Sequence, residues 1–461
     1  MRRPVRTVGS TARPINPSRT PPMTDNTLDA GAPLHDSAHY LHAVTELAET
    51  RPVVAQAAIY SESGIKLVAE GMRIDRRLYE RLVQHTLREP VDTHLWVEGA
   101  LTTATLSAAA REILSSSVLP YKLAQTVRSP EALLAPLASM PLPSSVAFKL
   151  TLMREQRPAL WKHSVEMMLI SMYLAHRSET SQRECTALCA AALMHDAGML
   201  HLDPAWEDPQ HKPVGADRKH LVVHPITSML MVRQAQVYPR SVEVAILEHH
   251  ERMDGSGYPR SIPGAQISAM GRVLLLAEVA AAIYEKYEEM PALQLALVLR
   301  LNHRKFPAGL SSYLLPLLDE ERARDSALMP IGANAARQLE TLADAFSEWE
   351  RLKASLAHPK QSTSAKNALA QPLAFIEMRL GALHKVLLES GTHPTQQIAL
   401  ISQLDGDAAG MAEVAFVGKE ALWQLQTIVN ACQRRWPAAH TSSPPEDHAA
   451  HRWCQWVLSR L

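Results

Sequence analysis

The chain has 461 residues, and its 47 lysines and arginines balance 47 aspartates and glutamates, so the formal net charge is zero. This balance argues against binding to polymeric nucleic acid, and four cysteines are too few for a disulfide framework in so long a chain. No uncharged apolar stretch reaches the roughly 18 residues of a membrane span. We therefore expect a cytoplasmic protein of several globular units.

The N-terminal part of the chain divides into two predicted segments. Residues 1–34 are rich in proline, serine, threonine and arginine, and we expect a disordered leader. Met23 opens a more ordinary sequence, so a start site placed too early is an alternative explanation. Residues 35–140 are predicted to form a small α/β module of unassigned role, with a hairpin around Ser63 and Gly64, because apolar and polar residues alternate on both sides.

The rest of the chain has mainly helical periodicity. The proline-containing stretch 139–145 predicts a linker, followed by a helical domain over 146–320 and a helical extension over 321–356. A second linker is predicted at 357–372 and a C-terminal helical bundle at 373–461. In that bundle the apolar residues favour core packing over a self-associating coiled coil, because the heptads are irregular. The predicted fold class is mainly α.

Histidines cluster in the central domain, where nine of the 21 fall between His163 and His250. Glu278 stands alone in an apolar run, and burying a carboxylate there costs several kcal/mol unless a cation compensates it. Nitrogen and oxygen ligands of this kind suit iron, manganese, zinc or nickel. The candidate ligands are His163, His195, Asp196, His224, His249, His250 and Glu278.

Seven side chains are too many for one ion, and this number predicts two metals bridged by a carboxylate, Asp196. Two ions about 3.5–4 Å apart can hold a hydroxide between them and neutralise a phosphate, the arrangement used in phosphodiester hydrolysis. His195 and Asp196 project about 100° apart on a helix, so both can reach a site placed between their directions. The residues alone thus predict phosphohydrolase chemistry.

Three motifs in this region resemble the HD-GYP family of metal-dependent phosphohydrolases. They are His195-Asp196-Ala197-Gly198, His224-Pro225 and the unbroken run HHERMDGSGYP from His249 to Pro259. The resemblance covers roughly residues 148–318 and implies an all-helical HD-type domain. It implies hydrolysis of cyclic di-GMP to pGpG, GMP or both, with two divalent metals, iron or manganese.

The resemblance also implies a role for individual residues. His163, His195, Asp196 and Glu278 would hold one metal, and Asp196 would bridge to a second metal held by His224, His249 and His250. A hydroxide between the metals would be the nucleophile, with Asp196 and His195 as the catalytic pair. A rigid loop beside the site is implied for Asp254, Gly255, Gly257, Tyr258 and Pro259. The implied partners are GGDEF-domain cyclases and a second copy of the chain.

The sequence departs from the family pattern at positions that meet the substrate. Met199 stands where the family has a lysine, and Tyr287 and Met290 stand where it has arginines. Glu278 replaces an aspartate, which keeps the charge and moves the oxygens by about one methylene. Lys286 is the remaining basic residue nearby, so it is the candidate substrate contact.

Alternatives remain open at this point. The chain could be a catalytically weakened signalling module, a phosphohydrolase for another nucleotide or cyclic dinucleotide, or, as a distant alternative, a di-iron site for oxygen chemistry. His220 could replace His224 as a ligand, although only His224 is followed by proline. Ala159 stands where some family members have a third-metal glutamate, so we expect two metals. Cys185 and Cys189 are expected to be buried helix thiols rather than ligands.

Overall fold

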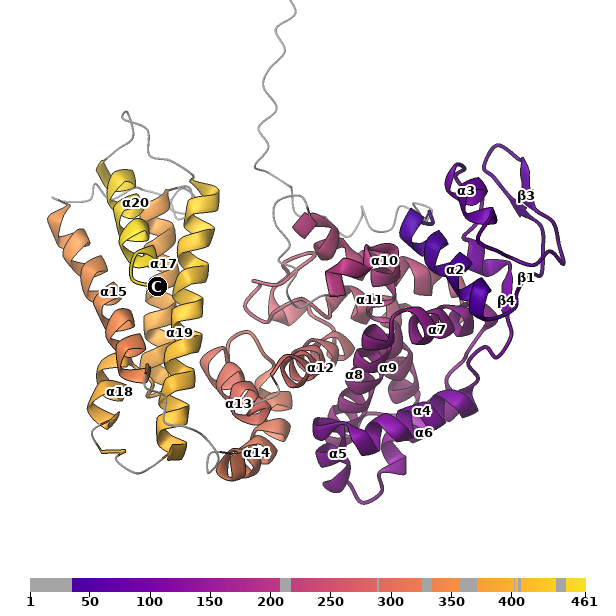
Figure 1. The fold of residues 1–461 in the computed structure, drawn as a ribbon. Coiled ribbons are helices and arrows are strands. Elements are labelled where there is room, and N and C mark those ends of the chain that lie inside the picture. The colour runs from indigo at the N-terminus through magenta and orange to yellow at the C-terminus, as the bar shows by residue number, and fades with distance from the viewer. Residues whose placement is uncertain are drawn as a thin grey trace, which may run out of the picture.

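The protein is described by a computed structural model (Figure 1). It describes residues 35–207, 217–287, 290–325, 334–356, 371–401, 403–404, 408–436 and 445–461. The predicted leader 1–34 and most of the predicted linker 357–372 lie outside these residues. The described chain is mainly helical, which confirms the predicted fold class. Among the described helices we find none that is long and apolar enough to cross a membrane.

The N-terminal module combines short strands with short helices. Its elements are α2 (Ala38–Thr50), β1 (Val53–Ala55), β2 (Ile59–Tyr60), β3 (Lys66–Val68), α3 (Leu78–Val83), the 3-10 turn η1 (Val91–Thr93) and β4 (Leu95–Val97). Strands β1 and β4 pair antiparallel, with Val54 opposite Trp96. Strands β2 and β3 form the hairpin predicted around Ser63 and Gly64, with Ile59 opposite Val68.

Three further helices connect this module to the central domain: α4 (Thr103–Ser116), α5 (Val118–Gln125) and α6 (Glu131–Ser139). Thr102 and Thr105 cap the start of α4 reciprocally. Most buried apolar side chains between Tyr40 and Leu318 form one continuous core. The linker predicted at 139–145 is therefore a short connection inside one core, and the next helix already begins at Ser144.

The central domain is helical. Its elements are α7 (Ser144–Gln156), α8 (Pro158–Arg177), α9 (Gln182–Met194), η2 (Ala197–His201), η3 (Pro204–Glu207), α10 (Asp217–Ala235), α11 (Arg240–Glu248), η4 (Gly264–Gln266), α12 (Ala269–Lys286), α13 (Pro291–Leu301) and α14 (Ala308–Asp325). Pro158 starts α8, and a Ser181–Glu184 capping box starts α9. Helices α8, α9, α11 and α12 pack side by side around the histidine cluster.

The C-terminal bundle forms a separate group of helices (Figure 1). They are α15 (Ala335–Ser355), α17 (Pro372–Glu389), α18 (Pro394–Ile401), α19 (Ala408–Arg435) and α20 (Pro445–Leu458). Helices α15, α17, α19 and α20 share a second core, in which the rings of Trp349 and Trp453 lie 5.1 Å apart, and α18 packs against α15 and α19. The helix α15, which lies in the predicted helical extension 321–356, thus packs within the bundle.

Helix α13 joins the central domain to the bundle. Met290, Leu293 and Leu297 are buried against Ala412 and Val417 of α19. Met290, the residue just before α13, adopts a left-handed backbone conformation with φ of 50°. Its side chain therefore forms part of the contact with the bundle.

A buried polar cluster ties the N-terminal module to the turn that follows the central histidines. Lys149 on α7 lies 2.8 Å from the Asp92 carboxylate, and both side chains are buried. The Tyr40 hydroxyl donates a hydrogen bond to the same carboxylate. The His201 ring, at the end of η2, stacks on Tyr40 with centroids 4.5 Å apart. The position of η2 is thus set partly by the N-terminal module.

Asp36 in this cluster makes the stability of the protein depend on pH. Burial and the negative charge of Asp92 raise the pKa of Asp36 from 3.8 to about 7, although a hydrogen bond from the Val91 N–H opposes the shift. The folded state therefore binds more protons than the unfolded state between these values, and stability falls as pH rises through this window. We expect Asp36→Asn to be more stable than the wild type at pH 8 by about 1–3 kcal/mol.

Urea unfolding at pH 5 and pH 8 measures this difference. The pKa of His201, which burial lowers to about 4, acts in the opposite direction, so each variant is compared with the wild type at the same pH. Asp75→Asn, at an exposed position, is the matched control and should show no pH-dependent gain. An equal stability difference between Asp36→Asn and wild type at both pH values would contradict the prediction.

Candidate metal centre

The seven candidate ligands come from five helical segments that meet in the central domain. His163 lies on α8, His224 on α10 and Glu278 on α12. His195 follows the last turn of α9, and His249 follows the last turn of α11. At each of these two ends the next residue is also a candidate ligand: Asp196 and His250. The structure thus brings together all seven side chains.

Two groups of these side chains could each hold an ion. Within each group every residue offers one ligand atom, and these atoms lie within 4.8 Å of one another. The first group is Asp196, His224, His249 and His250, and the second is His163, His195 and Asp196. Asp196 is common to both groups.

The Asp196 carboxylate lies between the two groups and presents one oxygen to each. Its Oδ1 is 3.0 Å from His224 Nε2 and 3.4 Å from His249 Nε2. Its Oδ2 is 3.4 Å from His195 Nε2. This is the placement that a bridging carboxylate requires.

Glu278 lies beside the second group, where its extra methylene still allows it to reach the histidines. Its Oε2 is 2.9 Å from His163 Nε2 and 3.4 Å from His195 Nε2. On the other side of the His163 ring, Nδ1 is 2.9 Å from a carboxylate oxygen of Glu285, which lies about two turns after Glu278 on α12. Two carboxylates therefore orient His163.

The charges in the cluster shift several pKa values. Burial lowers the pKa of His195, but Asp196 and Glu278 outweigh it and raise the value to about 9. Burial also opposes ionisation of Asp196 and Glu278, but the neighbouring histidines hold the pKa of both carboxyls well below their usual range. Burial lowers the pKa of His250. A metal ion would have to displace the proton of His195, so its binding should strengthen with rising pH.

The donor atoms are arranged as in a metal site. The Nδ1 atoms of His195, His224 and His249 lie 2.7, 2.5 and 2.6 Å from backbone carbonyl oxygens, which leaves each Nε2 facing the cluster. His195 Nε2 and Asp196 Oδ1 are buried and form no hydrogen bond among the described residues, although Asp196 Oδ2 lies 3.4 Å from the first and His224 Nε2 lies 3.0 Å from the second. Unpaired buried polar atoms are costly, and a divalent ion would compensate them. The residues therefore fit a metal.

Glycine at position 198 allows the close approach that places Asp196 opposite His224. A Cβ at Gly198 would lie 2.5 Å from the His224 carbonyl oxygen and 2.9 Å from the Ser228 backbone nitrogen. The Gly198 N–H donates to the Ser228 hydroxyl at 2.8 Å. The glycine of the HDxG motif is thus required by the packing of η2 on α10.

The loop after His250 folds back over that histidine. The Tyr258 N–H donates to the His250 carbonyl oxygen at 3.1 Å, and the two rings stack with centroids 4.6 Å apart. Gly255 has a φ of 75°, and a Cβ at Gly257 would lie 2.4 Å from backbone atoms of the same loop. Asp254 accepts hydrogen bonds from Ser256, and the Tyr258–Pro259 peptide bond is cis. The loop predicted at these residues lies beside the cluster.

The remaining candidates lie around the cluster in different settings. Lys286 is exposed at the end of α12, with its Nζ 5.2 Å from the Tyr287 ring centroid. Met199 is buried in η2, and Met290 packs against α19. The side chain of His220 lies outside the described residues, whereas His224 lies within the cluster.

Sequence reasoning missed three glutamates that support the site. Glu285 holds His163, and its spacing of seven residues from Glu278, which puts both on one face of α12, was the available signal. Glu248 accepts hydrogen bonds from Arg260 at 2.6 Å and from Ser268. Glu251 accepts from the Arg260 N–H at 2.8 Å and, with Glu248, anchors the loop.

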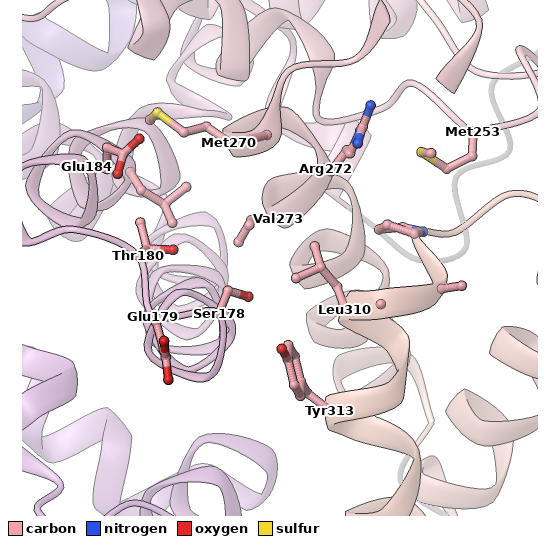
Figure 2. Close-up of a pocket in the computed structure, with 15 residues that line it drawn as sticks. Ser178, Glu179, Thr180, Glu184, Met253, Met270, Arg272, Val273, Leu310 and Tyr313 are labelled. Atoms are coloured by element: carbon pink, nitrogen blue, oxygen red, sulfur yellow. The ribbon is translucent and has the colours of Figure 1, made fainter. Parts of the chain in front are cut away.

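A cavity of about 660 Å³ lies in the same domain but apart from the ligand cluster (Figure 2). It is surrounded by the end of α8, the first half of α9, and the starts of α12 and α14. The residues labelled there are Ser178, Glu179, Thr180, Glu184, Met253, Met270, Arg272, Val273, Leu310 and Tyr313. None of the seven candidate ligands lines it.

Comparisons with known proteins place the central domain in a family. An HD domain family model matches residues 147–296. The chain is 27% identical over 151 residues to a 3′3′-cGAMP-specific phosphodiesterase of Vibrio cholerae, covering 32% of this chain and 34% of that protein. It is 24% identical over 121 residues to the cyclic di-GMP phosphodiesterase PdeB of Borreliella burgdorferi, covering 26% of this chain and 32% of that protein.

The matches thus span about a third of the length of these two relatives. A solved structure of an HDG“Y”P protein from Bdellovibrio bacteriovorus aligns with a TM-score of 0.33 and 15% identity, over 58% of this chain and 94% of that one. The family match covers all seven candidate metal ligands, which are the six between His163 and His250 and, further along the chain, Glu278. Residues 147–296 of this chain form an HD domain, with relatives that are named as cyclic dinucleotide phosphodiesterases.

Proposed function

We propose that this chain is a metal-dependent phosphodiesterase that hydrolyses cyclic di-GMP to pGpG, GMP or both. The observation that carries the proposal is the carboxylate of Asp196, which is shared by two groups of ligand atoms. A single structural or electron-transfer metal would require only one group of ligand atoms, without a second group beside it. A pair of adjacent sites is what phosphodiester hydrolysis uses.

The chain's own residues have separate tasks in this reaction. Two divalent ions, iron or manganese, would supply an activated water and neutralise charge on the phosphate. His163, His195, Asp196 and Glu278 would hold one ion, and Asp196, His224, His249 and His250 the other. Tyr258 positions His250 by stacking on its ring. In the net reaction a bond from the water oxygen to phosphorus forms, the bond from phosphorus to the ribose oxygen breaks, and a proton ends on the released hydroxyl.

The relatives support a cyclic dinucleotide as the substrate class. One is named for 3′3′-cGAMP and the other for cyclic di-GMP. Both substrates contain the same pair of phosphodiester bonds and differ in one base. We therefore propose cyclic di-GMP as the first substrate to test and 3′3′-cGAMP as the second.

The test is product detection by chromatography. Anaerobically purified protein, loaded with iron or manganese, is incubated with each dinucleotide, and Asp196→Ala serves as the blank. Linear dinucleotide or mononucleotide above the blank supports the proposal. Protein that holds two metals per chain and releases no product from either dinucleotide would contradict it.

A second candidate function is a signalling module with weakened turnover. The observation that favours it is the burial of Met290 against α19, at a position where the HD-GYP pattern has a substrate-binding arginine. In this case the protein would retain two metals and bind the dinucleotide without hydrolysing it. Binding without product in the same assay distinguishes this candidate from the first.

Glu285→Gln is expected to weaken metal binding about 10-fold, because outer carboxylates that orient a ligating histidine contribute this much to affinity. Glutamine keeps the size of the side chain but loses the charge that fixes the His163 ring from its Nδ1 side. Manganese titration in competition with a chelating dye measures the affinity.

Glu340→Gln, at an exposed position on α15, is the matched control for Glu285→Gln. It should bind manganese as the wild type does. If both variants kept wild-type affinity, Glu285 would have no role in positioning His163.

A further inference from the structure

A second, smaller cavity of about 200 Å³ lies where the central domain meets the C-terminal bundle. Its walls come from Asp254 in the loop, from α17 and α19, and from the end of α13 and the residues just after it, which are Leu301, Asn302, Arg304 and Lys305. None of the seven candidate metal ligands lines this cavity, so it is distinct from the metal cluster.

The lining carries more positive than negative charge. Arg304, Lys305 and Arg379 line the cavity, and among its described lining residues Asp254 supplies the carboxylate. Arg304 lies 3.6 Å from Glu389, but both side chains of this pair are about half exposed, so the pair is weak. The Asp254 carboxylate already accepts two hydrogen bonds within its own loop. An anion would therefore meet three cations here.

Lys305 is the most buried of these cations. Its Nζ makes no hydrogen bond or ion pair with the residues that the structure describes, although the side chain is half-buried. Burial lowers the pKa of Lys305, and the positive charges of Arg252 and Arg379 lower it further. The negative charges of Asp254 and Glu420 oppose this shift. A half-buried ammonium without a partner is what a bound anion stabilises.

An exposed aromatic ring adjoins the cations. Trp423 on α19 lines the cavity and is 57% exposed, which is unusual for this side chain. Indole rings form stacking platforms for nucleobases, and such stacking does not depend on base identity. Next to it, Gln424 donates to Asn302 at 3.3 Å and so links α19 to the end of α13. The cavity lining thus combines cationic side chains with a flat aromatic ring.

We propose that this cavity binds a nucleoside monophosphate, with its phosphate on Lys305 and Arg379 and its base against Trp423. A volume of about 200 Å³ is below the roughly 300 Å³ at which sites for drug-sized ligands begin. The phosphate and sugar fill the cavity while the base remains at its rim, and a cyclic dinucleotide is too large. Because Asp254 follows His250 by four residues, the bound nucleotide touches the same loop that covers the metal cluster.

The test measures binding rather than turnover, so it does not depend on the proposed phosphodiesterase activity. GMP is titrated into the full-length protein by calorimetry, and again into the Asp196→Ala chain, which separates this cavity from the metal cluster. We expect Lys305→Gln and Arg379→Gln each to weaken GMP binding about 10-fold or more, and Lys305→Arg to retain it. Lys385→Gln, an exposed lysine on α17 that does not line the cavity, is the control and should bind as the wild type does.

Two further ligands and a fluorescence signal test the geometry. Guanosine and inorganic phosphate should each bind more weakly than GMP, and GMP should quench fluorescence in the wild type but less in Trp423→Phe. Melting temperatures confirm that each variant is folded. Failure of GMP to bind, unchanged binding in Lys305→Gln, or equal affinity for GMP and guanosine would overturn the proposal. Equal affinity for GMP and phosphate would overturn the base contact.

Discussion

Replacing Asp196 by alanine is expected to reduce the metal content from two ions per chain to one or none and to lower the phosphodiesterase rate by at least about 10³-fold. The carboxylate presents Oδ1 to His224 and His249 and Oδ2 to His195. Its removal takes one ligand from both groups at once, whereas the loss of any single histidine would take a ligand from one group only. Metal analysis after gel filtration measures the ion content directly.

The control for this substitution is Asp203→Ala, at an exposed position seven residues further along the chain. It should keep both ions and the full rate. Asp196→Asn keeps the size of the side chain, and we expect it also to lose metal, because the amide supplies one weak oxygen ligand instead of two charged ones. If Asp196→Ala retained two ions with a wild-type melting temperature, the bridging role of this residue would be refuted.

Four of the candidate ligands could be predicted from the sequence because the pairs His195-Asp196 and His249-His250 each lie at the end of a helix. His195 and His249 close α9 and α11, so the residues that follow them point into the same space. Gly257 is likewise explained by contacts inside its own loop, whereas Gly198 is explained by the packing of η2 on α10. Local pattern was therefore enough to find these two pairs.

Other features depend on contacts between distant segments and could not be predicted in this way. The proline-rich stretch at 139–145 reads as a linker, but apolar faces of α4, α5 and α6 cover α8 and α9, so the core continues across it. The burial of Met290 depends on α19, which lies more than 100 residues further along the chain. Lys305 and Trp423 line one cavity only because the bundle docks on α13. None of these contacts can be recognised from a periodic pattern in the sequence.

Met199→Lys is expected to raise the turnover of cyclic di-GMP about 10-fold or more. A charged contact to the reacting phosphate is worth about 3–4 kcal/mol at full strength, and a newly introduced lysine should recover part of that. Met199 is buried in η2, three residues after Asp196, and its N–H donates to the Asp196 carbonyl oxygen at 2.9 Å. A side chain at this position therefore starts next to the metal cluster. Steady-state rates at equal metal content measure the effect.

Met199→Leu is the matched control, because it keeps the apolar character and the approximate volume of the side chain. Burying an ammonium is costly, so the melting temperature of Met199→Lys should fall by a few degrees, and the rates must be compared below that temperature. A faster lysine variant would mean that the metal centre is competent and that the missing charge limits the rate. Equal rates for the lysine and leucine variants would exclude this charge as the limit and favour a module that binds the dinucleotide without efficient turnover.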